Sequence, residues 1–163
     1  MPSCELPPGT PPRRLLIIAC TATKRPDVPL LPAYLRYLGT SFRILRRWID
    51  DHPDAATRLD VVILSAEFGL IPAIQPIPDY NRRMTMERAE ALRGQVCAAL
   101  RQRCAVRGYA EVFISAGAVY RLALADALPH FGTTPVLTAP AGAGIGRQLA
   151  ALKQWLATTS GPG

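Results

Sequence analysis

Hydrophobic residues along the chain alternate between short continuous runs and longer segments with helical spacing. The runs cover residues 15–20, 61–66, 112–116 and 135–139. Each is rich in Val, Ile or Leu and ends in small residues, which is typical of strands buried on both faces of a parallel sheet. The pattern therefore predicts four buried strands.

Helices are predicted between these strands. Residues 41–51 place Phe42, Leu45 and Trp48 on one face, as an amphipathic helix does. Thr85 is a predicted N-cap, with Glu87 in the first turn of a helix that runs to about residue 107. Two further helices are predicted over residues 117–128 and 146–157.

Alternating strands and helices predict an α/β fold, which we expect to be a three-layer Rossmann-like sandwich with a mainly parallel sheet of about four strands. The 163 residues suit one domain. Residues 15–157 are predicted to form it, between a flexible Pro-rich tail at 1–14 and a short flexible tail at 158–163.

Two long Pro-rich connections, 25–32 and 71–78, follow the first and second predicted strands. Both leave from the carboxyl ends of their strands, which is where open α/β sheets bind ligands. We therefore expect the functional residues to gather at this edge of the sheet.

The net charge of +7 comes from 17 Arg and 2 Lys against 12 acidic residues. Such a balance favours a polyanionic partner, so nucleic acid is a possible one. Arg, Ala, Pro and Gly also share GC-rich codons, and genomic composition is an alternative cause of the arginine excess. Arg43, Arg46 and Arg47 form a basic stripe that either contacts phosphates or is a solvated helix face.

Several classes of protein are disfavoured. The four cysteines contain no CxxC pair, and the two histidines lie far from them in sequence, so we predict no metal and no cofactor. No apolar run is long enough to cross a bilayer, and no secretory leader is visible. We expect a cytoplasmic protein without a membrane partner. The sequence does not determine its oligomeric state.

The turn after the first strand contains Cys20, Thr21, Thr23 and Lys24. Its hydroxyls, backbone amides and ammonium group suit an anionic ligand, although such hydroxyls also satisfy donors of an ordinary loop. Cys20 is either a thiolate nucleophile favoured by Lys24 or a small buried hydrophobic residue.

Two polar segments follow the second strand. Glu67 is a candidate general base or nucleophile, or else the ion-pair partner of an arginine. Gly69 allows a tight turn with positive φ. Tyr80 could stack a base while Arg82 or Arg83 binds phosphate, or this segment could only anchor its loop.

A glycine-rich turn joins the last strand to the last helix. Gly142, Gly144 and Gly146 would let the backbone approach a ligand at a helix N-terminus. The turn matches neither a Walker motif nor a dinucleotide fingerprint. Gly117, after the third strand, is predicted to lie at the same edge of the sheet.

Several motifs occur in an order that resembles a known family. They are Cys-Thr-Ala-Thr-Lys at 20–24, a Tyr at 37 followed by Ser-Phe at 41–42, Leu-Ser-Ala-Glu-Phe-Gly-Leu-Ile at 64–71, Ile-Pro-Asp-Tyr at 77–80, a Gly and Tyr at 117 and 120, and Gly-Ile-Gly-Arg-Gln-Leu at 144–149. They are similar to peroxide-stress YaaA-like proteins and to small uncharacterised bacterial and phage proteins that resemble them. The resemblance spans roughly residues 15–156.

This resemblance implies ligand contacts at the matching positions, which are Cys20, Lys24, Tyr37, Ser65, Gly69, Tyr80, Gly117, Gly144 and Gly146. It also implies a compact Rossmann-like fold that handles nucleotides or modified bases. YaaA itself is longer and is associated with oxidative stress, DNA binding and limitation of free iron.

Our leading hypothesis is a domain that binds a phosphorylated, nucleotide-like small molecule at the carboxyl edge of its sheet. Whether it is an enzyme is left open; N-glycosidic or related base chemistry would use Glu67 as base or nucleophile and Tyr80 to hold the base. Lys24 with Gly144 and Gly146 would hold phosphate. The alternatives are a non-enzymatic DNA-binding stress protein and an interaction subunit.

Overall fold

A five-stranded sheet forms the centre of the protein, which is described by a computed structural model over residues 13–140 and 142–158. The strand order is β4-β3-β1-β6-β7. The strands are β1 (Arg14–Ala19), β3 (Leu59–Ser65), β4 (Gly69–Pro72), β6 (Glu111–Ser115) and β7 (Val136–Thr138). All neighbours are parallel except β3 and β4. The mixed α/β architecture is compatible with a Rossmann-like fold.

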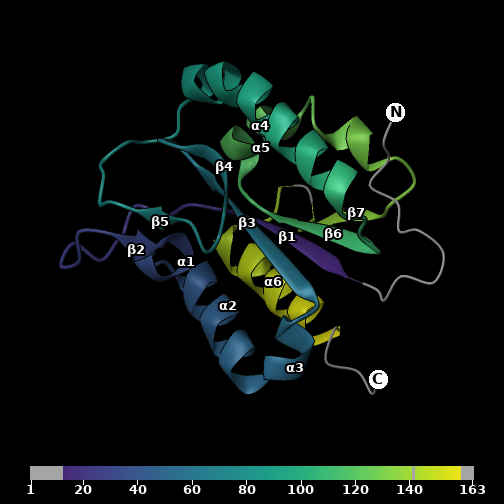
Figure 1. Cartoon of the computed structure of the whole chain (residues 1–163), viewed down its shortest axis with the longest axis horizontal. Helices are drawn as coiled ribbons and strands as arrows, with labels where there is room; N and C mark the ends of the chain where they lie inside the picture. Colours follow the sequence, from purple (N-terminus) through teal and green to yellow (C-terminus); the bar gives the residue numbers. More distant parts are fainter. Residues whose placement is uncertain (1–12, 141, 159–163) are drawn as a thin grey trace.

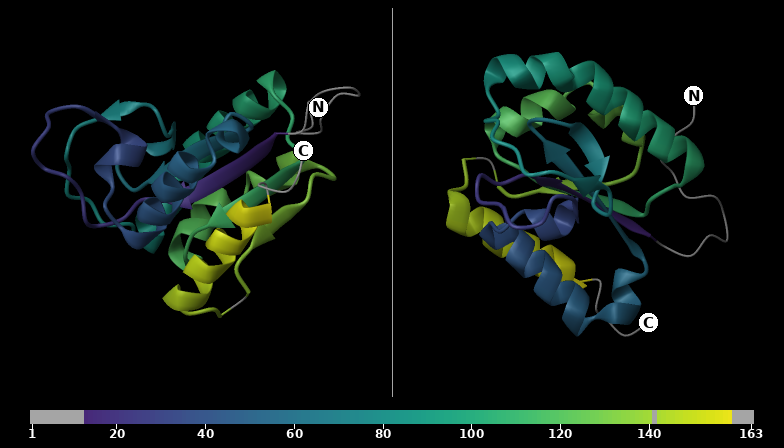
Figure 2. Two further views of the ribbon diagram at one scale, coloured as in Figure 1. Left: turned by 90° about the horizontal axis from the view of Figure 1, so that it is seen from below. Right: turned by 60° about the vertical axis from the view of Figure 1, so that its left-hand side comes forward.

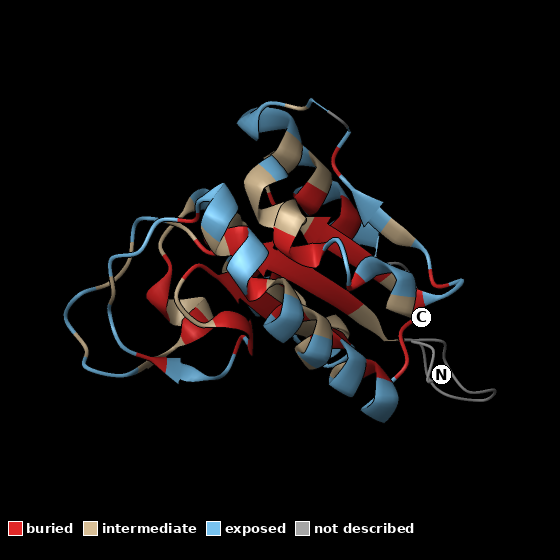
Figure 3. Cartoon of the chain, turned by 90° about the horizontal axis from the view of Figure 1, so that it is seen from above, coloured by how far each residue is buried: buried red, intermediate tan, exposed pale blue. Residues whose placement is uncertain are grey.

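Helices flank the sheet (Figures 1 and 2). Helices α4 (Met86–Val106) and α5 (Ala118–Leu124) lie along one face, and α2 (Thr40–Asp51) and α6 (Ile145–Thr158) along the other. The short helix α3 (Pro53–Ala56) precedes β3, and a 3₁₀ turn (Leu128–Phe131) precedes β7. The central strand β1 is the most enclosed, and its residues 15–18 are fully buried (Figure 3).

A small lobe projects beyond the carboxyl ends of β1 and β3 (Figure 1). It consists of β2 (Leu31–Pro32), α1 (Ala33–Arg36) and β5 (Pro76–Ile77). Strands β2 and β5 pair in antiparallel register. They lie in the two Pro-rich connections, which the sequence analysis treated as separate loops and which together form this lobe.

The four predicted strands are present, but β7 is an edge strand with Leu137 and Thr138 exposed, so the prediction that all four are buried was wrong. The sheet also has a fifth strand, β4, which the sequence analysis assigned in part to a connection. Gly69 has φ of +73°, as its predicted turn requires, and this turn reverses the chain into β4. The prediction for β4 was wrong because β4 is only four residues long and ends in a proline, so its own pattern is too short to show a strand.

The predicted helix boundaries agree with the structure except in one segment. Thr85 is the N-cap of α4, and its side chain accepts a hydrogen bond from the Arg88 amide. The helix expected over 117–128 ends at Leu124 and is followed by the 3₁₀ turn. The predicted tails lie outside the described residues except at 13, 14 and 158; Arg14 lies in β1 and Thr158 in α6.

Nothing in the described part of the chain has the length and apolar character of a membrane-crossing helix. The longest helix, α4, has 21 residues and carries charged side chains throughout. Its buried positions are spaced three and four apart, which explains why it packs along one face of the sheet.

The buried guanidinium of Arg36 holds the small lobe together. Arg36 is fully buried on α1 and donates to the carbonyl oxygens of Arg25, Val28 and Ile77. The first two carbonyls belong to the connection before β2, and the third ends β5. One side chain therefore joins both connections from the inside.

Replacing Arg36 with Leu should cost about 3–5 kcal/mol of stability, because buried carbonyls lose their charged donor. Urea unfolding measures the loss, and limited proteolysis should show faster cleavage within residues 25–32. Arg58→Leu is the control, since Arg58 is exposed and its side chain has no partner among the described residues. Equal stability of the two variants would contradict this role.

Candidate functional site

A cavity opens between the carboxyl ends of β1 and β6. The chain passes from β1 to β3 on one side and later places β6 on the other side of β1. Loops that leave two such strands diverge, and ligands of open α/β sheets bind in the resulting crevice. The cavity measures about 640 Å³ and is lined by Cys20, Thr21, Ala22, Lys24, Asn81, Arg82, Arg83, Met84, Gly117, Ala118, Val119 and Tyr120.

Three cationic side chains, Lys24, Arg82 and Arg83, belong to this lining. Arg82 forms an exposed ion pair with Glu67, with 3.4 Å between nitrogen and oxygen. Arg83 is exposed and makes no ion pair within the described ranges. The ammonium of Lys24 is 3.3 Å from the carbonyl oxygen of Ala22. Of these three cations, only Arg82 has a carboxylate partner among the described residues, so the cavity favours an anion.

The lining also has an apolar part, which Met84, Ala118 and Val119 provide. Met84 is buried, whereas Ala118 is exposed. Cavities that bind organic ligands combine apolar walls with a few polar groups that set orientation. The mixture here suits a molecule that has an anionic end and an uncharged end.

A thiol and a phenol meet at the inner wall of the cavity. The Cys20 sulfur lies 3.4 Å from the Tyr120 hydroxyl. Burial raises the pKa of Tyr120, so the phenol stays protonated at neutral pH and can donate. In the described part of the chain, no three His, Cys, Asp or Glu side chains gather as metal ligands would.

Behind the cavity, Tyr37, Ser65 and Tyr80 share a chain of hydroxyl contacts. The Tyr80 oxygen is 2.6 Å from that of Tyr37 and 3.0 Å from Ser65 Oγ. Ser65 Oγ also accepts from the amides of Glu67 and Phe68. These contacts fix the end of β3 against the small lobe.

Lys24 rests on this cluster through its cation–π contact with Tyr80. Its nitrogen lies 4.3 Å from the centre of the Tyr80 ring and 5.9 Å from that of Tyr37. The Phe68 ring meets the Tyr80 ring in a T-shaped arrangement. The Tyr80 ring contacts Lys24 and Phe68, and its hydroxyl contacts Tyr37 and Ser65. Tyr80 therefore positions Lys24 and does not itself line the cavity.

Burial controls the ionisation of the phenols in the cluster. It raises the pKa of Tyr37 to about 12, against the smaller opposing effect of hydrogen bonds from Tyr80 and Ser65. It also raises the pKa of Tyr80, and the nearby Cys20 adds to that shift. Both phenols are neutral at physiological pH.

Backbone pairing sets the position of the loop that carries Lys24. The Leu38 amide donates to the Thr23 carbonyl, and the Arg25 amide donates to the Arg36 carbonyl, both at 2.8 Å. Gly39 allows this approach, because a Cβ there would lie 2.3 Å from the Thr21 methyl. The loop is therefore held along its length and not only at its ends.

Arginines from the helices bind the other two loops at this edge. Arg88 on α4 donates to the carbonyls of Ala66 and Glu67 at 2.7 and 2.9 Å. Arg121 on α5 donates to the Ala116 carbonyl at 2.9 Å. These contacts explain how short loops without regular structure keep the cavity open.

The structure brings part of the sequence-predicted site together. The predicted residues that line the cavity are Cys20, Thr21, Lys24, Arg82 and Gly117. Tyr37, Ser65 and Tyr80 stand behind it, and the first two are fully buried. Thr23 and Glu67 do not line it, although Glu67 reaches it through Arg82. Gly69 is buried against Gln95 and serves the turn.

The glycine-rich turn is separate from this cavity. Gly142, Gly144 and Gly146 are exposed and are not part of the cavity lining. Gly142 has φ of +72°, which accounts for a glycine there. A Cβ at Gly144 or Gly146 would meet open space. The sequence analysis predicted that this turn and Lys24 bind the same phosphate. Lys24 lines the cavity and the turn does not, so the cavity does not bring them together.

Arg83 lines the cavity, and the sequence analysis named it as the alternative to Arg82 for binding phosphate. Other lining residues were not singled out. Asn81 lies in the same polar segment before α4, and Tyr120 follows Gly117 at the spacing noted in the resemblance. Both could have been found from their neighbours. Met84 and Val119 have no distinguishing sequence context, and only the fold shows that they line the cavity.

Comparison with known proteins places the chain in a family. Residues 15–154 match a family of unknown function, DUF6884. The chain belongs to this family. No curated protein sequence matches it. The family itself carries no assigned function, so the resemblance to YaaA-like proteins stays a prediction.

A solved structure shares the fold. The crystal structure of AF0587, a protein of unknown function, matches with a TM-score of 0.53 and 18% sequence identity. The match covers 94% of this chain and 46% of that chain, so the family member spans about half the length of its structural neighbour. At this identity the likeness shows the fold alone.

The buried phenols predict a loss of stability in alkali. A phenol whose pKa is raised on folding stabilises the protein below the unfolded pKa near 10 and loses this contribution as the pH rises toward about 12. Urea unfolding at about pH 8 and about pH 11 should differ by about 1.4 kcal/mol from Tyr37 alone, because pH 11 lies between the unfolded and folded pKa values. Tyr37→Phe should reduce the difference, and Tyr34→Phe should not. Identical pH profiles for both variants would refute the assignment.

Proposed function

We propose that the protein binds a phosphorylated, nucleotide-like small molecule in the cavity between β1 and β6. The observation that carries the proposal is the convergence of Lys24, Arg82 and Arg83 in that cavity. Phosphate oxygens are bound by such cations, and guanidinium groups bind them in a bidentate manner.

The cavity lining has a cationic part and an apolar part, which supports a ligand that carries both a phosphate and an uncharged ring. The cations suit the phosphate, and the apolar side chains of Met84 and Val119 suit an uncharged ring. A volume of about 640 Å³ is in the range of small-molecule sites. The proposal treats the fold as a three-layer Rossmann-like sandwich, whose ligands bind at the strand carboxyl ends.

A catalytic form of the proposal assigns an N-glycosidic or base-directed reaction to this site. Glu67 is then the base or nucleophile, because its carboxylate is partly exposed and pairs with Arg82, which lines the cavity. Tyr80 acts through Lys24, which it holds in place. Glu67→Gln would then retain binding and abolish turnover.

Binding is tested by calorimetry and thermal shift with adenosine monophosphate and with adenosine. We expect the monophosphate to bind and to raise the melting temperature by mass action, and the nucleoside to bind at least about tenfold more weakly. Lys24→Ala and Arg83→Ala should each weaken binding about tenfold or more. Lys153→Ala is the matched control, since Lys153 lies on α6 and outside the cavity.

Failure of a panel of nucleoside monophosphates and sugar phosphates to bind the wild-type protein would refute the function. Equal losses in Lys24→Ala and Lys153→Ala would refute the site. A steep decline of affinity with salt would instead indicate polyanion binding through counterion release. Chromatography of the bound ligand after incubation tests the reaction.

A further inference from the structure

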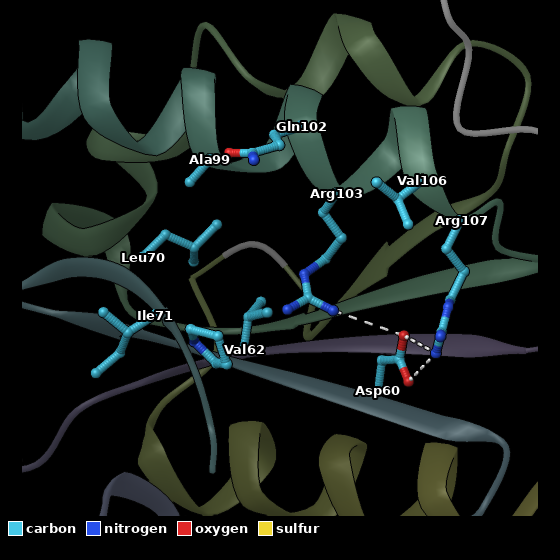
Figure 4. Close-up of a pocket in the computed structure, with 10 residues that line it drawn as sticks. Asp60, Val62, Leu70, Ile71, Ala99, Gln102, Arg103, Val106 and Arg107 are labelled. Atoms are coloured by element: carbon cyan, nitrogen blue, oxygen red, sulfur yellow. Dashed lines mark hydrogen bonds and ion pairs between the residues drawn. The ribbon is translucent and has the colours of Figure 1, made fainter. Parts of the chain in front are cut away.

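A groove lies between helix α4 and the β3–β4 hairpin (Figure 4), and it shares no lining residue with the cavity described above. It measures about 400 Å³. Most of its walls are apolar, and they are formed by Val62, Leu70, Ile71, Pro72, Ala99 and Val106. Val106, which is 81% exposed, belongs to this lining and extends its apolar wall toward solvent.

One end of this groove is strongly basic. The Asp60 carboxylate on β3 forms ion pairs with Arg107 and Arg103, with nitrogen–oxygen distances of 3.2 and 3.6 Å. Both arginines line the groove (Figure 4). Arg13 also pairs with Asp60, and the Tyr109 hydroxyl donates to it at 2.8 Å. Three guanidinium groups therefore surround one carboxylate.

The cluster keeps two uncompensated positive charges. Burial opposes the ionisation of Asp60, but hydrogen bonds from Arg13 and Tyr109 outweigh it and hold the pKa of Asp60 below its usual value. Asp60 is thus charged at neutral pH and supplies one negative charge against three positive ones. Arg107 is half-exposed and uses one nitrogen for Asp60, so its other donors are open to a ligand.

We infer that this groove is a second binding site, for an organic carboxylate with an apolar chain. The chain lies along Val62, Leu70 and Val106, and the carboxylate accepts hydrogen bonds from Arg103 and Arg107. The site is independent of the phosphate site proposed above, because the two linings share no residue.

Charge and shape together select this class of occupant. A small inorganic anion would leave the apolar walls in water, and a neutral apolar molecule would desolvate guanidinium groups without pairing them. A second copy of this face would bring the same excess positive charge against it. A carboxylate with a medium-length chain satisfies both parts of the groove.

The probe is octanoate, with octan-1-ol and acetate as controls that lack the charge or the chain. Binding to the full-length protein is measured by calorimetry and by NMR shifts of groove residues. We expect saturable binding of octanoate and at least about tenfold weaker binding of each control. Arg107→Gln and Val106→Asp should each weaken octanoate binding about tenfold.

Arg101→Gln is the matched control, because it removes one exposed charge from helix α4 outside the groove, whereas Arg107 is the C-cap of that helix. It should bind octanoate like the wild type. Failure of octanoate to bind, or equal losses in Arg101→Gln and Arg107→Gln, would overturn the inference. Val106→Asp changes an exposed side chain, so its fold is expected to persist and its melting curve verifies this. Unchanged octanoate binding in this variant would also overturn the inference.

Discussion

Backbone carbonyls in the loops at the carboxyl edge of the sheet have few strand partners, and arginine side chains satisfy them. Arg36 does this for three carbonyls from a fully buried position. Arg46 does it for carbonyls of α1 and its C-cap, and Arg88 and Arg121 do it for two other loops. A buried carbonyl without a donor is costly. The guanidinium groups therefore permit irregular loops to remain packed, and the shape of the cavity depends on them.

These contacts show that many of the arginines have a structural role. Several arginines face carbonyls or carboxylates of the chain itself, among them those of the Asp60 cluster. These arginines keep their positive charge, so the net charge stays +7, but many of their hydrogen-bond donors are already used inside the protein. Lys24 and Arg83 differ, because they line a cavity and have no carboxylate partner within the described residues.

The hydroxyl cluster of Tyr37, Ser65 and Tyr80 connects the end of β3 to the small lobe. It lies in a mostly buried region, where hydrogen bonds are strong and unpaired hydroxyls are costly. Because Lys24 packs on the Tyr80 ring, the cluster also orients a cation of the cavity. These tyrosines are thus structural supports of the site, although their residue types suggested direct contact with ligand.

The sequence by itself determined the four apolar strands, the N-cap Thr85 and the turn at Gly69, because each depends on local spacing or on one residue's conformational freedom. It also identified the edge of the sheet where Cys20, Lys24 and Gly117 meet. Only the tertiary structure decided the pairing of β2 with β5, the edge strand β4, the partners of the arginines and the separation of the glycine-rich turn from the cavity. Those features depend on contacts between residues far apart in the chain, which local patterns do not specify.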